Sequence, residues 1–320
     1  MVPIADDPGA RIVPTTDLDV GIGELQDEGY RLDMIAPADA PRIAEMSANG
    51  ERLRLVVAAP DAGGAPVGAE VVDEGRAGMR YRDLIPDRHD GRVIASHITI
   101  PNPGPVPDYV HYHDVDFQVI YARAGRVRVV YEDQGEPFWM EPGDCILQPP
   151  HIRHRVLETE GRLEVIEVTA PAEHPTYVEH DLALPNGVGD AGRLFGGQRF
   201  HFSRATDTEW CAVGEGWEVA RTGILGASFD AGDVHRFRPQ QDAPASAFAD
   251  GFDDGSLSMF VVVDGACAVD LNGAVQEFTE GQCASRAEPT EWRLERPSSD
   301  CVVLHVTLGW HGERFASDGI

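Results

Sequence analysis

The strongest constraint on the fold is an internal repeat of short apolar strands and turns. The segment SMFVVVDG at 258–265 aligns with QVIYARAG at 118–125. Further along, EGQCASRAEPTEWRL at 280–294 aligns with PGDCILQPPHIRHRV at 142–156. One strand plan that occurs twice in a chain predicts two copies of the same β unit, made by duplication.

The remaining segments support an all-β fold. RLRLVVAAP at 52–60 and RVIASHITIP at 92–101 have the alternation of half-buried strands, which places Leu53 and Leu55 on one face. Gly, Pro and Asp clusters separate these runs, and a Gly/Ala-rich stretch at 60–78 is typical of a loop or linker. Many short strands divided by turns predict a sandwich or a barrel.

We predict four regions along the chain. The N-terminal region also carries the signals of a short helix over 39–50. Asp39 can cap that helix, Pro41 suits its first turn, and Asn49-Gly50 suits its end. The predicted regions are an N-terminal extension and linker (1–78), a first β domain (79–172), a connection (173–198) and a second β domain (199–313).

Four polar side chains in the first copy can meet at one point. His111 and His113 are two residues apart, so both imidazoles project from one face of a strand. Gln118 opens the next strand, and His154 follows the turn at Pro149. Imidazoles gathered on strands are suited to a divalent transition metal, although ordinary interior histidines are the alternative.

This stretch resembles the cupin superfamily, whose first motif has a His-x-His pair, a glutamate five residues on and then a glycine. His111, His113, Gln118 and Gly125 occur at that spacing, and Gly143, Pro149 and His154 match the second motif. The departures are Gln118 for the ligand glutamate, His151 for a glycine and Glu158 for an asparagine. The resemblance implies an all-β chain with two jelly-roll barrels in tandem, a bicupin.

The ligand residues do not recur in the second copy. Its equivalent positions hold Gly251, Asp253, Ser258 and Trp292. One carboxylate without an imidazole does not make a comparable site, so we expect the second barrel to be structural. We therefore predict one metal per chain.

Strand alternation selects further residues for the substrate pocket. Tyr109 shares a face with His111 and His113, and Glu158 follows His154 by an even number of residues. Gln148 lies before the Pro149 turn and could reach the ligands. With Ile120, these residues form the predicted pocket, and no catalytic group is predicted beyond the metal.

The resemblance implies a metal-dependent enzyme, and we favour an Fe(II) dioxygenase. Its substrate would be a small metal-chelating molecule that carries oxygen, such as a hydroxylated aromatic or a diketone. Zn, Mn, Ni or Cu are the alternative metals. A non-redox lyase, isomerase or cyclase, and a binding protein without turnover, are the alternative functions, since a fold alone does not decide among them.

Composition limits the partners. A formal net charge of -28 argues against a nucleic-acid partner, because phosphates would be repelled. Five cysteines stand singly, no secretory signal is visible, and no apolar stretch is long enough to span a membrane. We expect a cytoplasmic protein that acts on a small molecule, with a homodimer left open.

Overall fold

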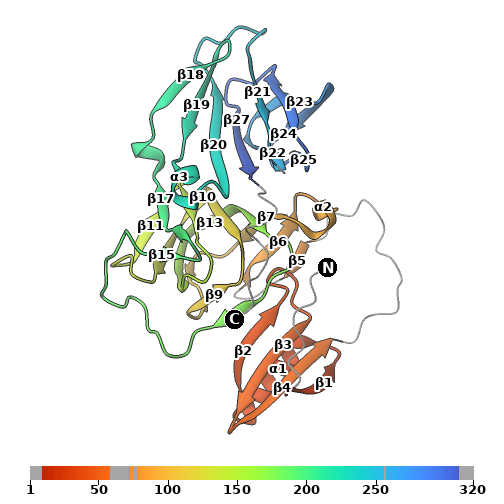
Figure 1. The fold of residues 1–320 in the computed structure, drawn as a ribbon, viewed down its shortest axis with the longest axis vertical. Coiled ribbons are helices and arrows are strands. Elements are labelled where there is room, and N and C mark those ends of the chain that lie inside the picture. The colour runs from red at the N-terminus through yellow and green to blue at the C-terminus, as the bar shows by residue number, and fades with distance from the viewer. Residues whose placement is uncertain (1–8, 58–71, 75–77, 256, 310–320) are drawn as a thin grey trace.

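The chain forms three parts stacked along its long axis (Figure 1). The computed structural model describes residues 9–57, 72–74, 78–255 and 257–309. A small N-terminal unit lies at the bottom of Figure 1, the first barrel in the middle and the second barrel at the top. The prediction of an all-β chain with tandem barrels is confirmed. Among the described helices, none is long and apolar enough to cross a membrane.

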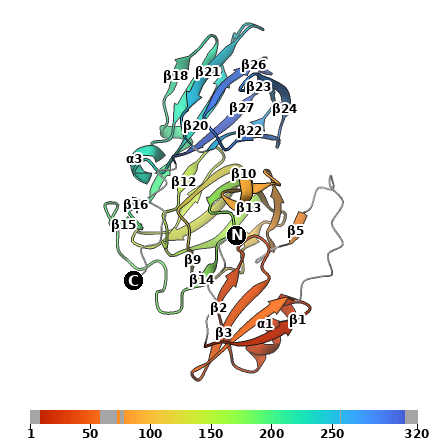
Figure 2. The ribbon, with the colours of Figure 1, turned by 45° about the vertical axis from the view of Figure 1, so that its right-hand side comes forward.

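The N-terminal unit is a four-stranded sheet with one helix. Leu53 and Leu55 are buried in its core, as the alternation predicted. Its edge strand β2 continues into the first barrel through β14 (Thr176–Val178), as the bottom of Figure 2 shows. The elements of the unit are β1 (Arg11–Thr15), α1 (Leu18–Asp27), β2 (Arg31–Ala36), β3 (Ile43–Ala48) and β4 (Glu51–Val57).

The helix predicted over 39–50 is wrong, since β3 occupies this stretch. Asn49 and Gly50 form the two-residue turn between β3 and β4, and both have positive φ angles, of 50° and 85°. Asn-Gly is the strongest signal for such a hairpin turn, and here it outweighs its other use as a helix end. The helix of this unit is α1, whose N-cap Asp17 accepts a hydrogen bond from Val20 N at 3.1 Å.

The first barrel is built around two long strands, β10 and β13, which pair along most of their length. The strand predicted within 92–101 is confirmed as β7, whereas most of the stretch 60–78 lies outside the described residues. The elements are β5 (Val72–Glu74), β6 (Arg80–Asp83), α2 (Arg88–Gly91), β7 (Ile94–Ile100), β8 (Gly104–Pro105), β9 (His111–His113), β10 (Phe117–Tyr131), β11 (Phe138–Met140), β12 (Cys145–Leu147) and β13 (His154–Ala170).

The second barrel repeats the strand pairing of the first. Its β22 pairs with β25 and β27, as β10 pairs with β12 and β13. β17, inside the predicted second domain, instead pairs with β12 of the first barrel. The elements after β14 are β15 (Leu194–Phe195), β16 (Gln198–Arg199), β17 (His201–Ser203), η2 (Ala205–Asp207), β18 (Trp210–Val213), β19 (Trp217–Arg221), α3 (Ile224–Ser228), β20 (Gly232–Pro239), β21 (Phe248–Asp253), β22 (Leu257–Asp264), β23 (Ala266–Leu271), β24 (Ala274–Thr279), β25 (Cys283–Arg286), β26 (Thr290–Glu295) and β27 (Val302–Leu308).

Equivalent glycines mark where the chain bends in each barrel. Gly125 and Gly265 have φ angles of 67° and 68°. A Cβ atom on Gly125 would lie 2.5 Å from the carbonyl oxygen of Arg162, so a larger residue has no room there. The aligned glycines of the repeat therefore have the same structural role in both copies.

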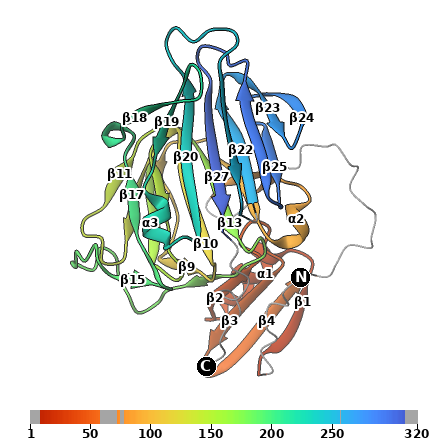
Figure 3. The same cartoon turned by 45° about the horizontal axis from the view of Figure 1, so that its top comes forward.

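The two barrels share one hydrophobic core, here called the inter-barrel core. β10, β12 and β13 contribute to it from the first barrel, and β20, β22 and β27 contribute from the second. Figure 3 shows β20, β22 and β27 in front of the first barrel. Phe117, Val119 and Tyr121 of β10 face this core, and the alternate residues of β10 face the first barrel's interior. Both faces of β10 are thus buried.

The interior of the second barrel is filled where the first has its histidines. Gly251 pairs with Trp292, as His111 pairs with His154 in the first barrel. Asp253, at the place of His113, accepts hydrogen bonds from Ser258 and from His305 Nε2 at 2.9 Å. The aligned positions therefore match in space, although their side chains form a packed polar and aromatic cluster.

Candidate metal centre

Three histidines from two strands meet inside the first barrel. β9 supplies His111 and His113, which are buried because both face the barrel interior. The first residue of β13, His154, pairs directly with His111. Their ligating nitrogens all lie within 4.8 Å of one another. Within the described chain, this is the group of His, Cys, Asp and Glu side chains that could hold a metal ion.

The Nδ1 atom of each ring is held by a neighbour. Nδ1 of His111 donates to the carbonyl oxygen of Tyr109 at 2.8 Å, and Nδ1 of His154 donates to that of Ile152 at 3.0 Å. Nδ1 of His113 lies 3.0 Å from the hydroxyl of Thr176. A proton on Nδ1 leaves the lone pair on Nε2, which is the form that binds a metal. The rings of His111 and His154 are therefore prepared as Nε2 ligands, and the hydroxyl of Thr176 can accept from His113 in the same form.

A buried carboxylate, Asp108, lies beside this cluster. Its Oδ1 is 3.7 Å from Nδ1 of His111, and its Oδ2 accepts a hydrogen bond from the backbone of Val156 at 2.9 Å. A carboxylate at this position favours a cation bound by the neighbouring imidazoles. His151, which replaces a motif glycine, lies outside the cluster in an exposed pair with Asp114.

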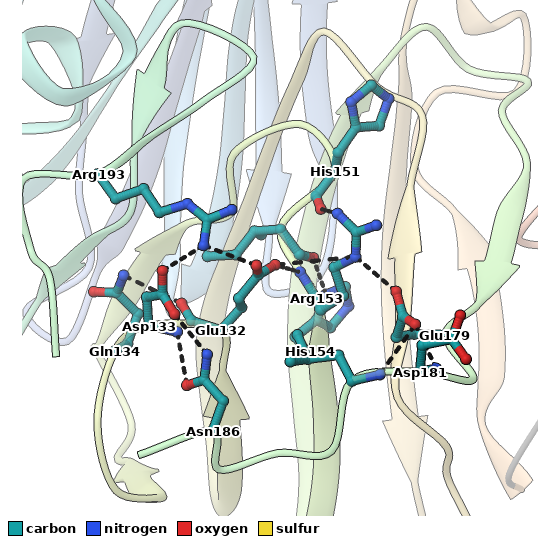
Figure 4. Close-up of polar contacts among 12 residues, drawn as sticks. Glu132, Asp133, Gln134, His151, Arg153, His154, Glu179, Asp181, Asn186 and Arg193 are labelled. Atoms are coloured by element: carbon teal, nitrogen blue, oxygen red, sulfur yellow. Dashed lines mark hydrogen bonds and ion pairs between the residues drawn. The ribbon is translucent and has the colours of Figure 1, made fainter. Parts of the chain in front are cut away.

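Polar contacts also fix the start of β13, where His154 begins the strand. Figure 4 shows Arg153, next to His154, bound to Glu179 in the connection that follows β14. The two side chains are 3.0 Å apart, and Arg193 of the same connection pairs with Asp133 in the turn after β10. The connection is thus tied to both strands at one end of the β10–β13 ladder, where Tyr131 pairs with His154, and this holds the backbone of His154 in place.

Gln118 belongs to a buried chain of hydrogen bonds. The hydroxyl of Tyr131 donates to Oε1 of Gln148 at 2.9 Å, and Nε2 of Gln148 donates to Oε1 of Gln118 at 2.7 Å. Nε2 of Gln118 is buried without a partner. Turning both amides by 180° keeps both bonds with donors and acceptors exchanged, and it leaves the Gln118 oxygen at the unpaired end. Gln118 is thus joined to the cavity through Gln148, while three histidines form the centre.

The histidines open into a cavity of about 90 Å³ inside the first barrel. Predicted pocket residues Ile120 and Gln148 line this cavity. Its walls are mainly apolar, which excludes water and strengthens electrostatic interactions with a bound ion. The apolar lining consists of Met79, Tyr81, Ile94, Ile98, Ile100, Val127, Val129, Met140, Val156, Leu163 and Val165.

Two predicted pocket residues lie elsewhere. Glu158 pairs with Arg128 at 2.9 Å on the partly exposed face of the barrel. The reason is a β-bulge: Val129 pairs with Val156 but Arg128 pairs with Glu158, so the extra residue moves Glu158 to the other face from His154. Tyr109 packs against the ring of His111 and is not part of the cavity wall.

The cavity wall also has polar residues that the sequence analysis did not select for the site, among them Glu167, Asp39 and His174. Glu167 lies on β13 opposite Ile120. It is two residues from Val165, which also faces the cavity, so strand alternation could have predicted its position. Asp39 comes from the N-terminal unit, and His174 comes from the segment between β13 and β14. Burial lowers the pKa of His174. No sequence pattern connects these last two residues to the metal centre.

Comparison with known proteins supports this description. Residues 97–169 match the family model of the Cupin domain, and no curated protein matches the sequence. Oxalate decarboxylase from Bacillus subtilis is similar in structure at a TM-score of 0.54 and 11% identity, with 73% of each chain covered. Salicylate 1,2-dioxygenase from Pseudaminobacter salicylatoxidans has a TM-score of 0.51 and 15% identity, with 68% of this chain and 71% of that chain covered.

Proposed function

We propose that this protein is a metal-dependent dioxygenase. The proposal starts from residues 97–169, which are a cupin domain within a bicupin-like fold. Its substrate would be a small chelating molecule that carries oxygen, and Fe(II) would be its metal. The observation that carries the proposal is the convergence of His111, His113 and His154 in one mainly apolar cavity. The neighbouring folds belong to a dioxygenase and a decarboxylase, so the fold itself supports both kinds of chemistry.

The donor set agrees with a transition metal of this kind. Three neutral imidazoles with Nδ1 held by neighbours suggest a divalent transition metal and leave its charge uncompensated by the ligands. When bound, Fe(II) would supply open coordination positions for a chelating substrate and for dioxygen, together with the redox chemistry.

The protein's own groups would prepare the substrate. The carboxylate of Glu167 lines the cavity and could accept the proton that a hydroxyl or an enol loses when it binds as an anion. In that step the O–H bond breaks, its electron pair stays on the substrate oxygen, and the proton moves to Glu167. The apolar wall keeps water away from the resulting anion. A volume of about 90 Å³ favours a short diketone or a similarly small chelator over a substituted ring.

The same carboxylate supports a second candidate, a non-redox lyase or isomerase. Glu167 could remove a proton from carbon next to a metal-bound carbonyl, which requires no oxygen. Oxygen dependence separates the two functions. With small 1,3-diketones and hydroxylated acids, the Fe(II)-loaded protein is expected to consume O2 as substrate disappears, and to stop without O2 or with Zn²⁺ in place of iron. An oxygen electrode with parallel chromatography checks this, and undiminished anaerobic turnover would show that the dioxygenase proposal is wrong.

The neutral Gln118 gives a further expected result. Gln118→Glu should retain metal or bind it more tightly, because an anionic ligand can replace an amide. An anionic chelator should bind the loaded variant more weakly by about 1 to 4 kcal/mol, since one unit of positive charge is cancelled at contact distance. Calorimetric titration of the metal and then of acetohydroxamate measures both effects. Tighter binding of acetohydroxamate to the variant would contradict this charge argument.

A further inference from the structure

Two acceptor atoms of residues in the cavity wall have no donor among the described residues. Nε2 of His174 and Oδ1 of Asp39 are buried without a hydrogen-bond partner, and both residues line the cavity. His174 is 3% exposed, and its ring lies 5.5 Å from that of His113, edge to face. Buried polar atoms are rarely left unsatisfied, and each one calls for an explanation.

The contacts of both side chains define what this position can bind. Nδ1 of His174 donates to the carbonyl oxygen of Pro171 at 3.1 Å, so in the neutral ring Nε2 carries a lone pair. Asp39 uses its other oxygen, Oδ2, to accept from Arg88 at 2.6 Å. The two unsatisfied atoms are therefore both acceptors, and a ligand at this position must bring O–H or N–H groups.

The position is built by two separate parts of the chain. Ala38 N of the N-terminal unit donates to the carbonyl oxygen of His174 at 3.0 Å, which joins the two segments beside the cavity. The side chain of Asp39 is only 12% exposed, and its ion pair with Arg88 holds it in place. The N-terminal unit thus contributes a residue to the wall of the cavity.

We infer that Asp39 and His174 form a specificity subsite, which accepts hydrogen bonds from a hydroxyl or amino group on the metal-bound substrate. The inference rests on the proposed function, because the metal would hold the chelating end of the same molecule. A carboxylate brings no hydrogen for either acceptor and would be repelled by Asp39, whereas Nε of Arg155, a buried donor that also borders the cavity, would attract it. The subsite therefore selects chelators that carry a hydroxyl or amino group at this end over those that carry a methyl group.

Small hydroxamates test the subsite, because their chelating ends are identical. Glycolohydroxamate and propionohydroxamate differ only by a hydroxyl in place of a methyl group of similar size. Co²⁺-loaded protein is titrated with each, and binding is followed by the visible spectrum of Co²⁺. We expect glycolohydroxamate to bind about tenfold more tightly.

Variants identify the residues responsible. His174→Phe removes one of the two acceptors and should reduce the preference for glycolohydroxamate over propionohydroxamate severalfold. His174→Gln returns an acceptor oxygen and should restore part of the preference. An unchanged preference in His174→Phe overturns the subsite but not the proposed function. If propionohydroxamate does not alter the Co²⁺ spectrum, the chelate premise fails and the subsite falls with it.

Discussion

His154→Ala is expected to weaken metal binding at least about 100-fold. The reason is geometric: the centre has three imidazoles whose Nδ1 atoms are already held, and removal of His154 leaves two on the short strand β9. The binding free energy of two neutral ligands in an apolar cavity is too small to offset the cost of dehydrating a divalent ion. Calorimetric titration with Zn²⁺ or Co²⁺ of metal-stripped protein gives the affinity.

His151→Ala is the matched control. His151 lies in the turn just before His154. Its side chain is 50% exposed and pairs with Asp114 outside the cavity. This variant should bind metal like the parent. Circular dichroism of both metal-free variants checks that they are folded. Equal metal affinity of the folded His154→Ala protein and the parent would contradict the assignment of His154 as a ligand.

Phe117→Ala is expected to lower the free energy of unfolding by about 3 to 5 kcal/mol. Phe117 is 1% exposed and lies in the inter-barrel core, where truncation of a ring leaves a cavity between the barrels. Phe252, on the second barrel, is 62% exposed and supplies the control. Phe252→Ala should change the free energy by less than about 0.5 kcal/mol.

Denaturant unfolding of the metal-free proteins measures both changes. A single transition is expected in the parent, because a shared core couples the barrels. Two separate transitions in the parent, with Phe117→Ala affecting only one of them, would show that the inter-barrel core does not join the barrels into one folding unit.

The repeat allowed much of the architecture to be predicted. Gly125 and Gly265 stand at the same bend, and the pairing of Gly251 with Trp292 reproduces that of His111 with His154. Alternation was sufficient here because each barrel has one interior face. The inter-barrel core was not predicted in detail, since a strand such as β10 is buried on both faces and its continuous apolar sequence does not reveal two different neighbours.

Local ambiguity explains the errors in the N-terminal unit. Asn49-Gly50 can end a helix or form a hairpin, and only the pairing of β3 with β4 decides between them. At β13, one bulge was enough to move Glu158 out of the cavity. An extra residue in a strand turns every following side chain to the opposite face of the sheet. Bulges leave no clear trace in a single sequence.

Some residues of the metal centre could be predicted from the sequence and others could not. His111, His113 and His154 could be found because a motif with fixed spacing carries them. Asp39 and His174 could not, since they reach the cavity through contacts between distant segments. The sequence thus predicts the centre itself better than the surroundings that would select its substrate.

X-ray absorption spectroscopy of protein loaded with one Zn²⁺ per chain tests the central claim most directly. The account predicts a first shell of nitrogen and oxygen at about 2.0 to 2.1 Å, with the scattering of three imidazole rings and no sulfur. A shell with sulfur at about 2.3 Å, or with fewer than two imidazoles, would contradict the three-histidine centre.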